Sequence, residues 1–254
     1  MPINRRDMLL LAGAGLLADP GRRQPVNSTQ GKLKAVVFDG FPIFDPRPVA
    51  ILAESLFPGQ GPAIMNAWRA RQFEYQWLRA LSGQYVDFLQ ATQDSLIFAF
   101  AQQHLALPED KMRQLLAKSA ELPAWPDALA ALARLRQDGL RLALLSNMTR
   151  AMLEAGIVRN GMQGVFEEVI STDSIRTYKP DPRAYQLALN RLRLRREEIL
   201  FAAFAGWDAA GAKWFGYPTF WVNRADGAPE ELGVSPDSSG RDLAALIQFV
   251  EGVR

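Results

Sequence analysis

The stretch VVFDGFPIFD, residues 36–45, decides the fold of this chain. It begins inside a short apolar run at residues 34–38, which is typical of a buried parallel strand. Asp39 follows the run directly, and three prolines between residues 42 and 48 break the pattern after it. Ligands of an open parallel sheet bind beyond the carboxyl ends of its strands, so Asp39 is either a nucleophile at that edge or a polar strand end.

Beyond this stretch the chain divides into a helical block and an alternating block. At residues 46–120, apolar side chains recur at helical spacing, as in IMNAWRARQFEYQWLRAL and YVDFLQATQDSLIFAFAQQHL. After residue 120, strands are predicted at residues 140–146, 166–172, 199–205 and, as the last strand, 218–223, and helices at residues 126–138, 149–155 (ended by Gly156), 182–192 and 208–216. Such alternation is typical of a doubly wound α/β sheet.

The predicted fold is therefore a Rossmann-like, doubly wound parallel sheet with an inserted all-helical cap. Residues 31–45 and 121–254 are predicted to form the α/β core, and residues 46–120 the cap. Residues 1–30 are predicted to be a separate signal and linker segment.

The N-terminal segment carries Arg5 and Arg6 before the short apolar run MLLLAGAGLLA at residues 8–18. This run is too short to span a bilayer as a helix of about 20 residues, so no stable membrane anchor is expected. Paired arginines before such a run resemble a twin-arginine export signal, which predicts a periplasmic protein that begins near Asp19. The alternative is a cytoplasmic protein with an N-terminal extension.

Composition excludes several classes of protein. The chain has no cysteine, which excludes thiol nucleophiles and thiolate zinc sites, and a single histidine, His104, which excludes histidine metal clusters. His104 follows an apolar helical pattern and is interpreted as a helix-end residue. The formal net charge of +2 argues against a nucleic-acid partner.

Polar residues stand at four predicted strand ends. They are Asp39, the pair Ser146-Asn147, Lys179 and Asp208. Each has a plain structural interpretation, as a helix cap for Asp208, a turn for the pair and a surface residue for Lys179. Because the carboxyl ends of parallel strands share one edge of the sheet, the set together predicts a site.

The order and the amino-acid sequences of these segments resemble those of the haloacid dehalogenase superfamily, and within it those of the type II (S)-2-haloacid dehalogenases, or L-2-haloacid dehalogenases. The narrower resemblance rests on WRARQFEYQWLRAL, LLSN, YKPDPRAYQ and WDAAGAKWFGYPTFWVNR, and it covers residues 34–224. It implies hydrolysis of small L-2-haloalkanoic acids to D-2-hydroxy acids through an aspartyl ester, without a metal or an organic cofactor. It also implies a homodimer that pairs through the cap, and the segment SLIFAFAQQHLAL is apolar enough to need cover.

The resemblance also implies a role for each site residue. The proposed roles are nucleophile for Asp39, halide cradle for Arg69, contacts to the substrate carboxylate and halide for Ser146 and Asn147, charge neutralisation for Lys179, support for Tyr185, orientation for Asp208, and apolar pocket walls for Phe41, Phe73, Phe88 and Trp207. The set is chemically coherent, because a departing halide is stabilised by guanidinium and amide donors.

Several positions depart from the family pattern. Phosphatases of the superfamily carry a second aspartate where this chain has Phe41, which disfavours the phosphatase alternative. Pro42 and Ile43 replace a glycine and a threonine, and Ala203 and Ala205 replace a serine and an asparagine. The lost polar groups are ones expected to hold the nucleophile and the hydrolytic water. A second hypothesis is therefore a catalytically impaired or non-catalytic relative that binds a small carboxylate.

Overall fold

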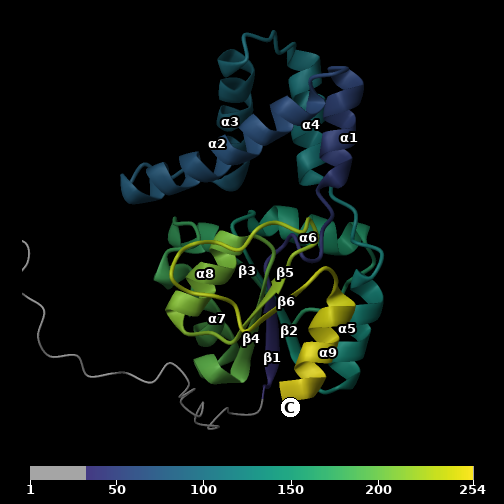
Figure 1. The fold of residues 1–254 in the computed structure, drawn as a ribbon, viewed down its shortest axis with the longest axis vertical. Helices are drawn as coiled ribbons and strands as arrows, with labels where there is room; N and C mark the ends of the chain where they lie inside the picture. The colour runs from purple at the N-terminus through teal and green to yellow at the C-terminus, as the bar shows by residue number, and fades with distance from the viewer. Residues whose placement is uncertain (1–32, 254) are drawn as a thin grey trace, which may run out of the picture. The chain divides into compact units, whose positions relative to one another are not determined.

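The computed structural model describes residues 33–253, and the export segment predicted at residues 1–30 lies outside them. The described residues belong to one compact unit built on a six-stranded parallel sheet (Figure 1). In spatial order the strands are β3 (Glu168–Ser171), β2 (Arg141–Ser146), β1 (Ala35–Phe38), β4 (Ile199–Ala203), β5 (Thr219–Val222) and β6 (Ser238–Gly240). With β1 at the centre and crossovers to both sides, this is the doubly wound sheet that the sequence predicted.

Alternate residues of the central strand face opposite sides of the sheet. Val36 and Phe38 belong to the core shared with α5 (Ala128–Gln137) and α9 (Leu243–Val253), whereas Ala35 and Val37 belong to the core shared with α7 (Pro182–Leu192) and α8 (Gly206–Phe215). Figure 1 shows these two pairs of helices on opposite sides of the sheet. Burial on both faces explains why the strands are continuous apolar runs.

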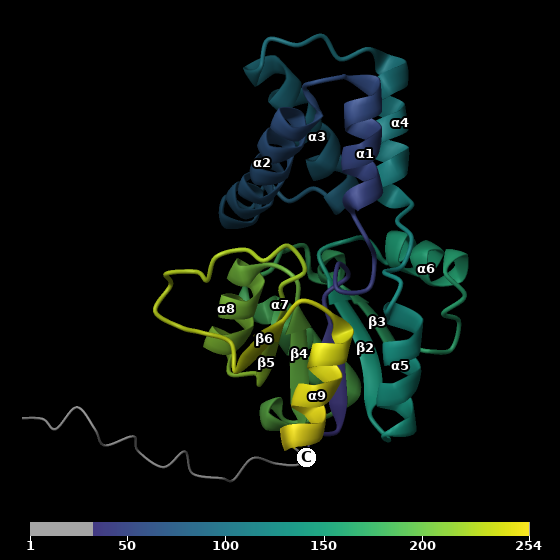
Figure 2. The ribbon, with the colours of Figure 1, turned by 45° about the vertical axis from the view of Figure 1, so that its right-hand side comes forward.

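The inserted block is all-helical, as predicted, and it consists of four helices between β1 and α5. They are α1 (Arg47–Leu56), α2 (Gly61–Leu81), α3 (Phe88–Gln102) and α4 (Glu109–Ala120). A proline lies in the first turn of α1 and of α2, the Asp87 side chain caps α3, and acidic residues begin α4. Helix α1 packs beside α4, and α2 packs beside α3 (Figure 2). His104 follows the end of α3, as interpreted from the sequence.

Two segments connect the cap to the sheet, and they lie side by side. Phe44 pairs with Ala124 in an isolated antiparallel bridge. The Trp125 indole donates to the Phe41 carbonyl at 2.8 Å, and the guanidinium groups of Arg47 and Arg224 each lie 4.3 Å from the centre of its ring system. The loop that follows Asp39 is thereby fixed to the segment that returns from the cap.

The predicted end of a helix at Gly156 is wrong. Helix α6 runs through this residue, from Arg150 to Arg159. A Cβ atom at position 156 would lie 2.9 Å from two ring carbons of Phe44. Glycine is therefore required here by close packing of an aromatic ring against the helix, and not by a left-handed helix end.

The prediction that residues 218–223 form the last strand is also wrong, because β6 and α9 follow β5. Strand β6 has the sequence SSG and joins the edge of the sheet through backbone pairing with β5, so its side chains carry no apolar alternation. In α9, Leu243, Leu246 and Val250 are fully buried at helical spacing. Two short 3-10 helices, η1 (Thr172–Ile175) and η2 (Arg196–Glu198), complete the core.

The described residues form one unit by their contacts, so the boundaries placed at residues 46 and 120 stay a prediction. Among residues 33–253, no helix combines the length and the apolar character needed to span a membrane.

Candidate active site

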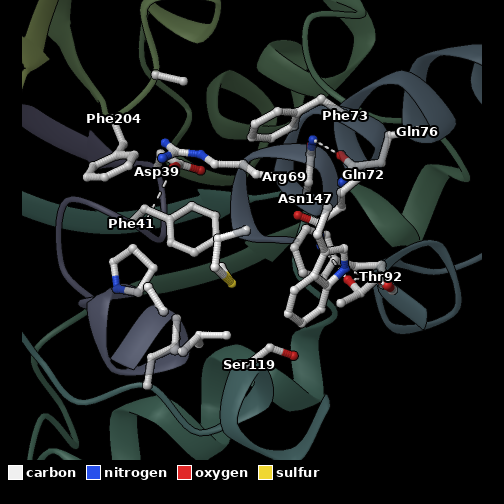
Figure 3. A pocket seen from close by; sticks show the side chains of 18 of the residues that line it. Asp39, Phe41, Arg69, Gln72, Phe73, Gln76, Thr92, Ser119, Asn147 and Phe204 are labelled. Atoms are coloured by element: carbon white, nitrogen blue, oxygen red, sulfur yellow. Dashed lines mark hydrogen bonds between the residues drawn. The ribbon is translucent and has the colours of Figure 1, made fainter. Parts of the chain in front are cut away.

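A cavity of about 420 Å³ lies between the carboxyl edge of the sheet and the cap (Figure 3). Most of the residues singled out from the sequence line it. These are Asp39, Phe41, Arg69, Phe73, Phe88, Ser146, Asn147, Lys179, Trp207 and Asp208. Tyr185 does not line the cavity but contacts Asp208 from the core. The structure thus brings together residues from both blocks of the sequence.

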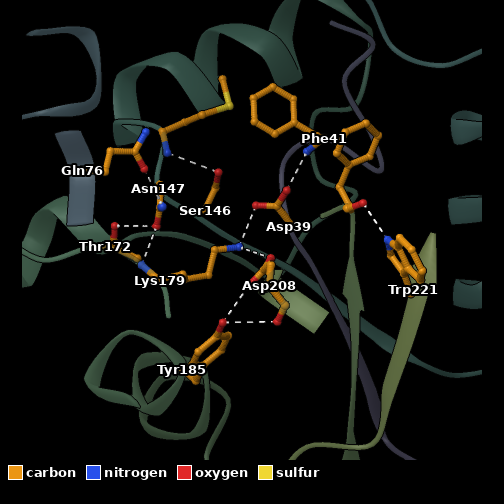
Figure 4. A network of polar contacts seen from close by, with 12 residues as sticks. Asp39, Phe41, Gln76, Ser146, Asn147, Thr172, Lys179, Tyr185, Asp208 and Trp221 are labelled. Atoms are coloured by element: carbon orange, nitrogen blue, oxygen red, sulfur yellow. Dashed lines mark hydrogen bonds and ion pairs between the residues drawn. The ribbon is translucent and has the colours of Figure 1, made fainter. Parts of the chain in front are cut away.

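Lys179 bridges two buried carboxylates at the floor of the site (Figure 4). Its Nζ atom donates to Asp39 Oδ1 and to Asp208 Oδ2, each at 2.7 Å. The Phe41 backbone N–H donates to the other oxygen of Asp39 at 3.2 Å. All three ionisable side chains are buried, so the ammonium has two charged partners in place of water.

The electrostatics of this group favour a charged lysine. Burial lowers the pKa of Lys179, but the carboxylates of Asp208 and Asp39 outweigh burial and raise it. Burial raises the pKa of Asp208, the Lys179 ammonium lowers it, and the Asp39 carboxylate raises it. Together these effects raise the pKa of Asp208 to about 6. Burial and the Asp208 carboxylate raise the pKa of Tyr185, so its phenol keeps its proton and donates to Asp208 Oδ1 at 2.7 Å.

Arg69 comes from α2 and supplies a cation on the cap side of the cavity. No carboxylate among residues 33–253 pairs with it, and its guanidinium carbon lies 5.9 Å from the ring centre of Phe204. The side chain remains exposed to solvent, although the protein atoms crowded around its guanidinium lower its pKa. A guanidinium without a carboxylate partner on a cavity wall is suited to bind an anion.

Asn147 ties three parts of the chain together. Its Oδ1 atom accepts from the Lys179 backbone N–H at 2.9 Å and from the Thr172 hydroxyl at 3.3 Å. Its Nδ2 atom donates to Gln76 Oε1 of the cap at 2.9 Å. The neighbouring Ser146 hydroxyl accepts from the Met148 N–H at 3.2 Å. Asn147 therefore fixes both the Lys179 loop and one helix of the cap.

Aromatic residues form the walls of the cavity. The rings of Phe73 and Trp207 meet edge to face with centres 5.2 Å apart, and Phe41 packs against Phe204 at 5.7 Å. Phe88 is buried and lines the same space. Such walls exclude water and accommodate an apolar group next to a few polar contacts.

Several residues that line the cavity were not predicted from the sequence, among them Phe204, Gln72 and Gln76. Phe204 directly follows β4, at the same edge of the sheet as Asp39, and this position was its signal. Gln72 and Gln76 lie three and seven positions after Arg69 on α2, a spacing that puts all three on one helix face. Their signal was this periodicity, which was used for the apolar residues alone.

The departures from the family pattern leave apolar groups beside the site. Ile43 and Ala203 are fully buried. Ala205 lines the cavity and is the N-cap residue of α8, where its side chain offers no acceptor to the helix. The Pro42 carbonyl accepts from Arg224 Nη2 at 3.0 Å. Residues 43, 203 and 205 therefore provide no side-chain hydrogen bond to water or to Asp39.

The two aspartates at the floor of the site, Asp39 and Asp208, are joined by a cation. Asp39 and Asp208 both contact the Lys179 ammonium. Within the part of the chain that the structure describes, no group of three or more His, Cys, Asp or Glu residues could hold a metal ion. Asp39 and Asp208 are thus already paired with a protein cation.

In this site a carboxylate lies beside a buried lysine, at the edge of a doubly wound sheet and under a helical cap. This arrangement defines a class of hydrolases with an aspartate at the active site. A family model described as haloacid dehalogenase-like hydrolase matches residues 23–216. The chain belongs to this family.

Similar proteins include several named for dehalogenation. Haloacetate dehalogenase H-2 of Moraxella sp. (strain B) is 38% identical over 86% of this chain and 98% of its own length. The (S)-2-haloacid dehalogenase of Pseudomonas sp. (strain YL) is 38% identical over 86% of this chain and 95% of its own length. The structure of L-2-haloacid dehalogenase from Xanthobacter autotrophicus with covalently bound chloropropionic acid has 32% identity and a TM-score of 0.80, and covers 87% of this chain and 100% of that one.

Proposed function

We propose that this protein hydrolyses the carbon–halogen bond of small L-2-haloalkanoic acids and releases halide and D-2-hydroxy acids. The observation that carries the proposal is the placement of Asp39, held by Lys179, in one cavity with Arg69, which has no carboxylate partner among the described residues. Relatives named (S)-2-haloacid dehalogenase and haloacetate dehalogenase support it.

In the first step a carboxylate oxygen of Asp39 forms a bond to C2 of the substrate. The carbon–halogen bond breaks, and its electron pair leaves with the halide. Arg69 stabilises the charge that develops on the halide. This step needs no proton donor, which agrees with Phe41 at the position where phosphatases carry a second acid.

In the second step water attacks the carbonyl carbon of the Asp39 ester. Asp208 takes a proton from the water, the ester bond breaks, and Asp208 returns this proton to the departing oxygen, which becomes the hydroxyl of the product. Asp39 is released as the carboxylic acid and loses its proton to solvent. Asp39 is restored as a carboxylate, and each turnover consumes one water and releases one halide and one proton. Because water does not attack C2, the configuration at C2 is inverted once.

A second candidate is favoured by the apolar residues beside the site. Since Ile43, Ala203 and Ala205 offer no hydrogen bond to water, an impaired relative that binds or is alkylated by a small halocarboxylate fits the same cavity. In that case the ester would form and persist.

Halide release from the separate enantiomers of 2-chloropropionate tests both candidates. The proposal expects release from the S enantiomer, with D-lactate as product, and no release by Asp39→Asn. Release of a single halide per site followed by no turnover would favour the impaired relative. Binding of the acid without any release would favour the non-catalytic one.

The assembly of two chains through the cap stays a proposal. In the segment SLIFAFAQQHLAL, Leu96, Ala99 and Phe100 are buried within one chain, whereas Ile97 is 46% exposed. Further support comes from the end of α2, where Leu78 is 59% and Leu81 is 87% exposed. Light scattering at micromolar concentration is expected to give twice the mass of 28.2 kDa, and a monomer would contradict the proposal.

Export to the periplasm is likewise a proposal, and it rests on Arg5 and Arg6 before the short apolar run. N-terminal sequencing of the protein from its native host is expected to give a start near Asp19. An intact Met1 on cytoplasmic protein would contradict it.

A further inference from the structure

Gln76 lines the cavity and has a side-chain N–H group without a hydrogen-bond partner. Of residues 33–253, three have a buried side-chain N or O atom without a partner, and two of these residues, Gln76 and Trp207, line the cavity. Gln76 is fully buried, and its Nε2 atom is the unpartnered one. A buried N–H group without an acceptor destabilises the folded protein, so its presence at a binding cavity indicates an acceptor supplied by a ligand.

The orientation of the Gln76 amide follows from a chain of obligatory donors (Figure 4). The Lys179 backbone N–H can only donate, and it donates to Asn147 Oδ1. Asn147 Nδ2 must then face Gln76, where it donates to Oε1. Gln76 Nε2 is therefore the atom directed away from Asn147. The backbone N–H of Lys179 in the core thus determines that Nε2, and not Oε1, is the unpartnered atom of the Gln76 amide.

We propose that Gln76 Nε2 donates a hydrogen bond to the halide as it leaves C2 of the substrate. The inference rests on the proposed dehalogenation and adds a residue to it. In the displacement at C2, the leaving group departs on the side opposite the attacking oxygen of Asp39. Since Asp39 lies at the edge of the sheet, the halide departs toward the cap, where Arg69 and Gln76 occupy one face of α2.

The two groups on α2 differ in what they offer the halide. Arg69 supplies charge, whereas Gln76 supplies a fixed neutral N–H that is already stripped of water. Such a preorganised donor stabilises the transition state more than the ground state, because the carbon-bound halogen is a poor acceptor and the departing anion is a good one.

Two substitutions separate this role from a structural one. Gln76→Glu keeps an oxygen that accepts from Asn147 but removes the free N–H, and Gln76→Met removes both. If Gln76 only held Asn147, the Glu variant would retain more activity than the Met variant, because only the Glu variant keeps the acceptor. As a matched control, Gln90→Met makes the same change at an exposed position of α3. Thermal unfolding shows whether each variant is folded.

The rate of halide release in the first turnover is measured with 2-chloropropionate and 2-bromopropionate. One preorganised donor is worth about 10²–10³ in rate at oxyanion sites, and we expect a loss of about ten-fold or more for chloride in both Gln76 variants. The loss for bromide should be smaller, because its charge is more diffuse. Inhibition by added chloride should weaken in the same variants, and Gln90→Met should match the wild type. An equal loss for both halides with a raised KM would overturn the proposal, as would an unchanged rate.

A second readout keeps the inference separate from the proposed reaction. Broadening of the chloride NMR signal by the resting protein measures halide binding without turnover. Wild-type protein is expected to broaden the signal, and the uncharged variant Gln76→Met is not. If the wild type released no halide from any 2-halo acid, the proposed function would fail, while this difference in binding would still support Gln76 as a halide ligand. Equal broadening by both proteins would overturn the inference, whatever the activity.

Discussion

Lys179 Nζ lies 2.7 Å from Asp39 Oδ1, although the two residues are 140 positions apart in the sequence. The same ammonium contacts Asp208 at 2.7 Å, so a single cation holds two carboxylates. On the other Asp39 oxygen, the Phe41 N–H makes a longer contact of 3.2 Å. Oδ2 is thus the oxygen more weakly held, and it is the one we expect to attack.

Removal of Lys179 should affect both activity and stability. Lys179→Met leaves two buried carboxylates without their cation, and the loss of one partner of a buried pair costs about 3–5 kcal/mol. We expect a fall of this size in the free energy of unfolding in urea at pH 8, together with the loss of halide release. Asp39→Asn should also abolish halide release but should leave the Lys179–Asp208 pair in place. Equal stability of wild type and Lys179→Met would contradict this account.

Arg69→Ala should lower the rate of the first step with little effect on stability. Removal of one preorganised donor typically costs about 10²–10³ in rate, and Arg69 has no carboxylate partner in the described chain to lose. Arg71→Ala is the control, since Arg71 lies on the same helix and pairs with Glu74. Halide release in the first turnover and thermal unfolding provide the measurements. A variant at position 69 with wild-type rates would exclude the guanidinium from the reaction.

Ala205→Asn should stabilise the protein and speed the second step. An asparagine at the N-cap of α8 can accept from the first turn of the helix, which is worth about 0.5–2 kcal/mol relative to alanine. Its amide also borders the cavity and can orient water near the Asp39 ester. With a 2-bromo acid, the initial burst of halide should stay unchanged while the steady rate rises, further so with Ala203→Ser.

Mass spectrometry of the intact protein should show less of the Asp39 ester in Ala205→Asn than in the wild type during turnover. The placement of reacting groups to within about an ångström can change rates by about 10². If the wild type shows neither a burst nor an adduct, other residues place the water.

The steady rate should depend on the protonation of Asp208. Burial raises its pKa to about 6, above its ordinary value, so the carboxyl gains a proton as the pH falls through about 6. A protonated Asp208 cannot accept a proton from water, and the second step should slow below this pH while the burst changes less. Because the folded state binds this proton more tightly than the unfolded state, this group taken alone favours folding more as the pH falls. Asp208→Asn should remove the inflection from the pH profile.

The cavity should accept acids longer than chloropropionate. Its volume of about 420 Å³ falls in the range of about 300–1,000 Å³ that is common for drug-sized ligands. We expect kcat/KM for 2-bromooctanoate to equal or exceed that for 2-bromopropionate. Met65 lines the cavity, and Met65→Trp should reduce the activity on the longer acid alone. A steady fall of kcat/KM with chain length in the wild type would contradict the expectation.

The sequence alone predicted the elements whose apolar residues recur at a regular spacing. Apolar strands buried on two faces and amphipathic cap helices both carry such a signal, and so do polar residues at strand ends. The prediction failed at Gly156, because a glycine required by a ring packed against the helix was interpreted as a helix end. It also failed at β6, because this strand pairs through its backbone and its side chains show no apolar pattern. The free Nε2 of Gln76 was also beyond the sequence, because its orientation depends on contacts across the cavity with Asn147.

Trp125 gives the active-site loop a mechanical connection to the cap. Its indole holds the Phe41 carbonyl, and the same ring carries Arg47 at the start of α1 and Arg224 from beyond β5. A displacement of the start of α1 would therefore move the indole that holds the peptide two residues after Asp39. The orientation of the nucleophile is thus linked to the cap through α1, which packs against α2, the helix that carries Arg69.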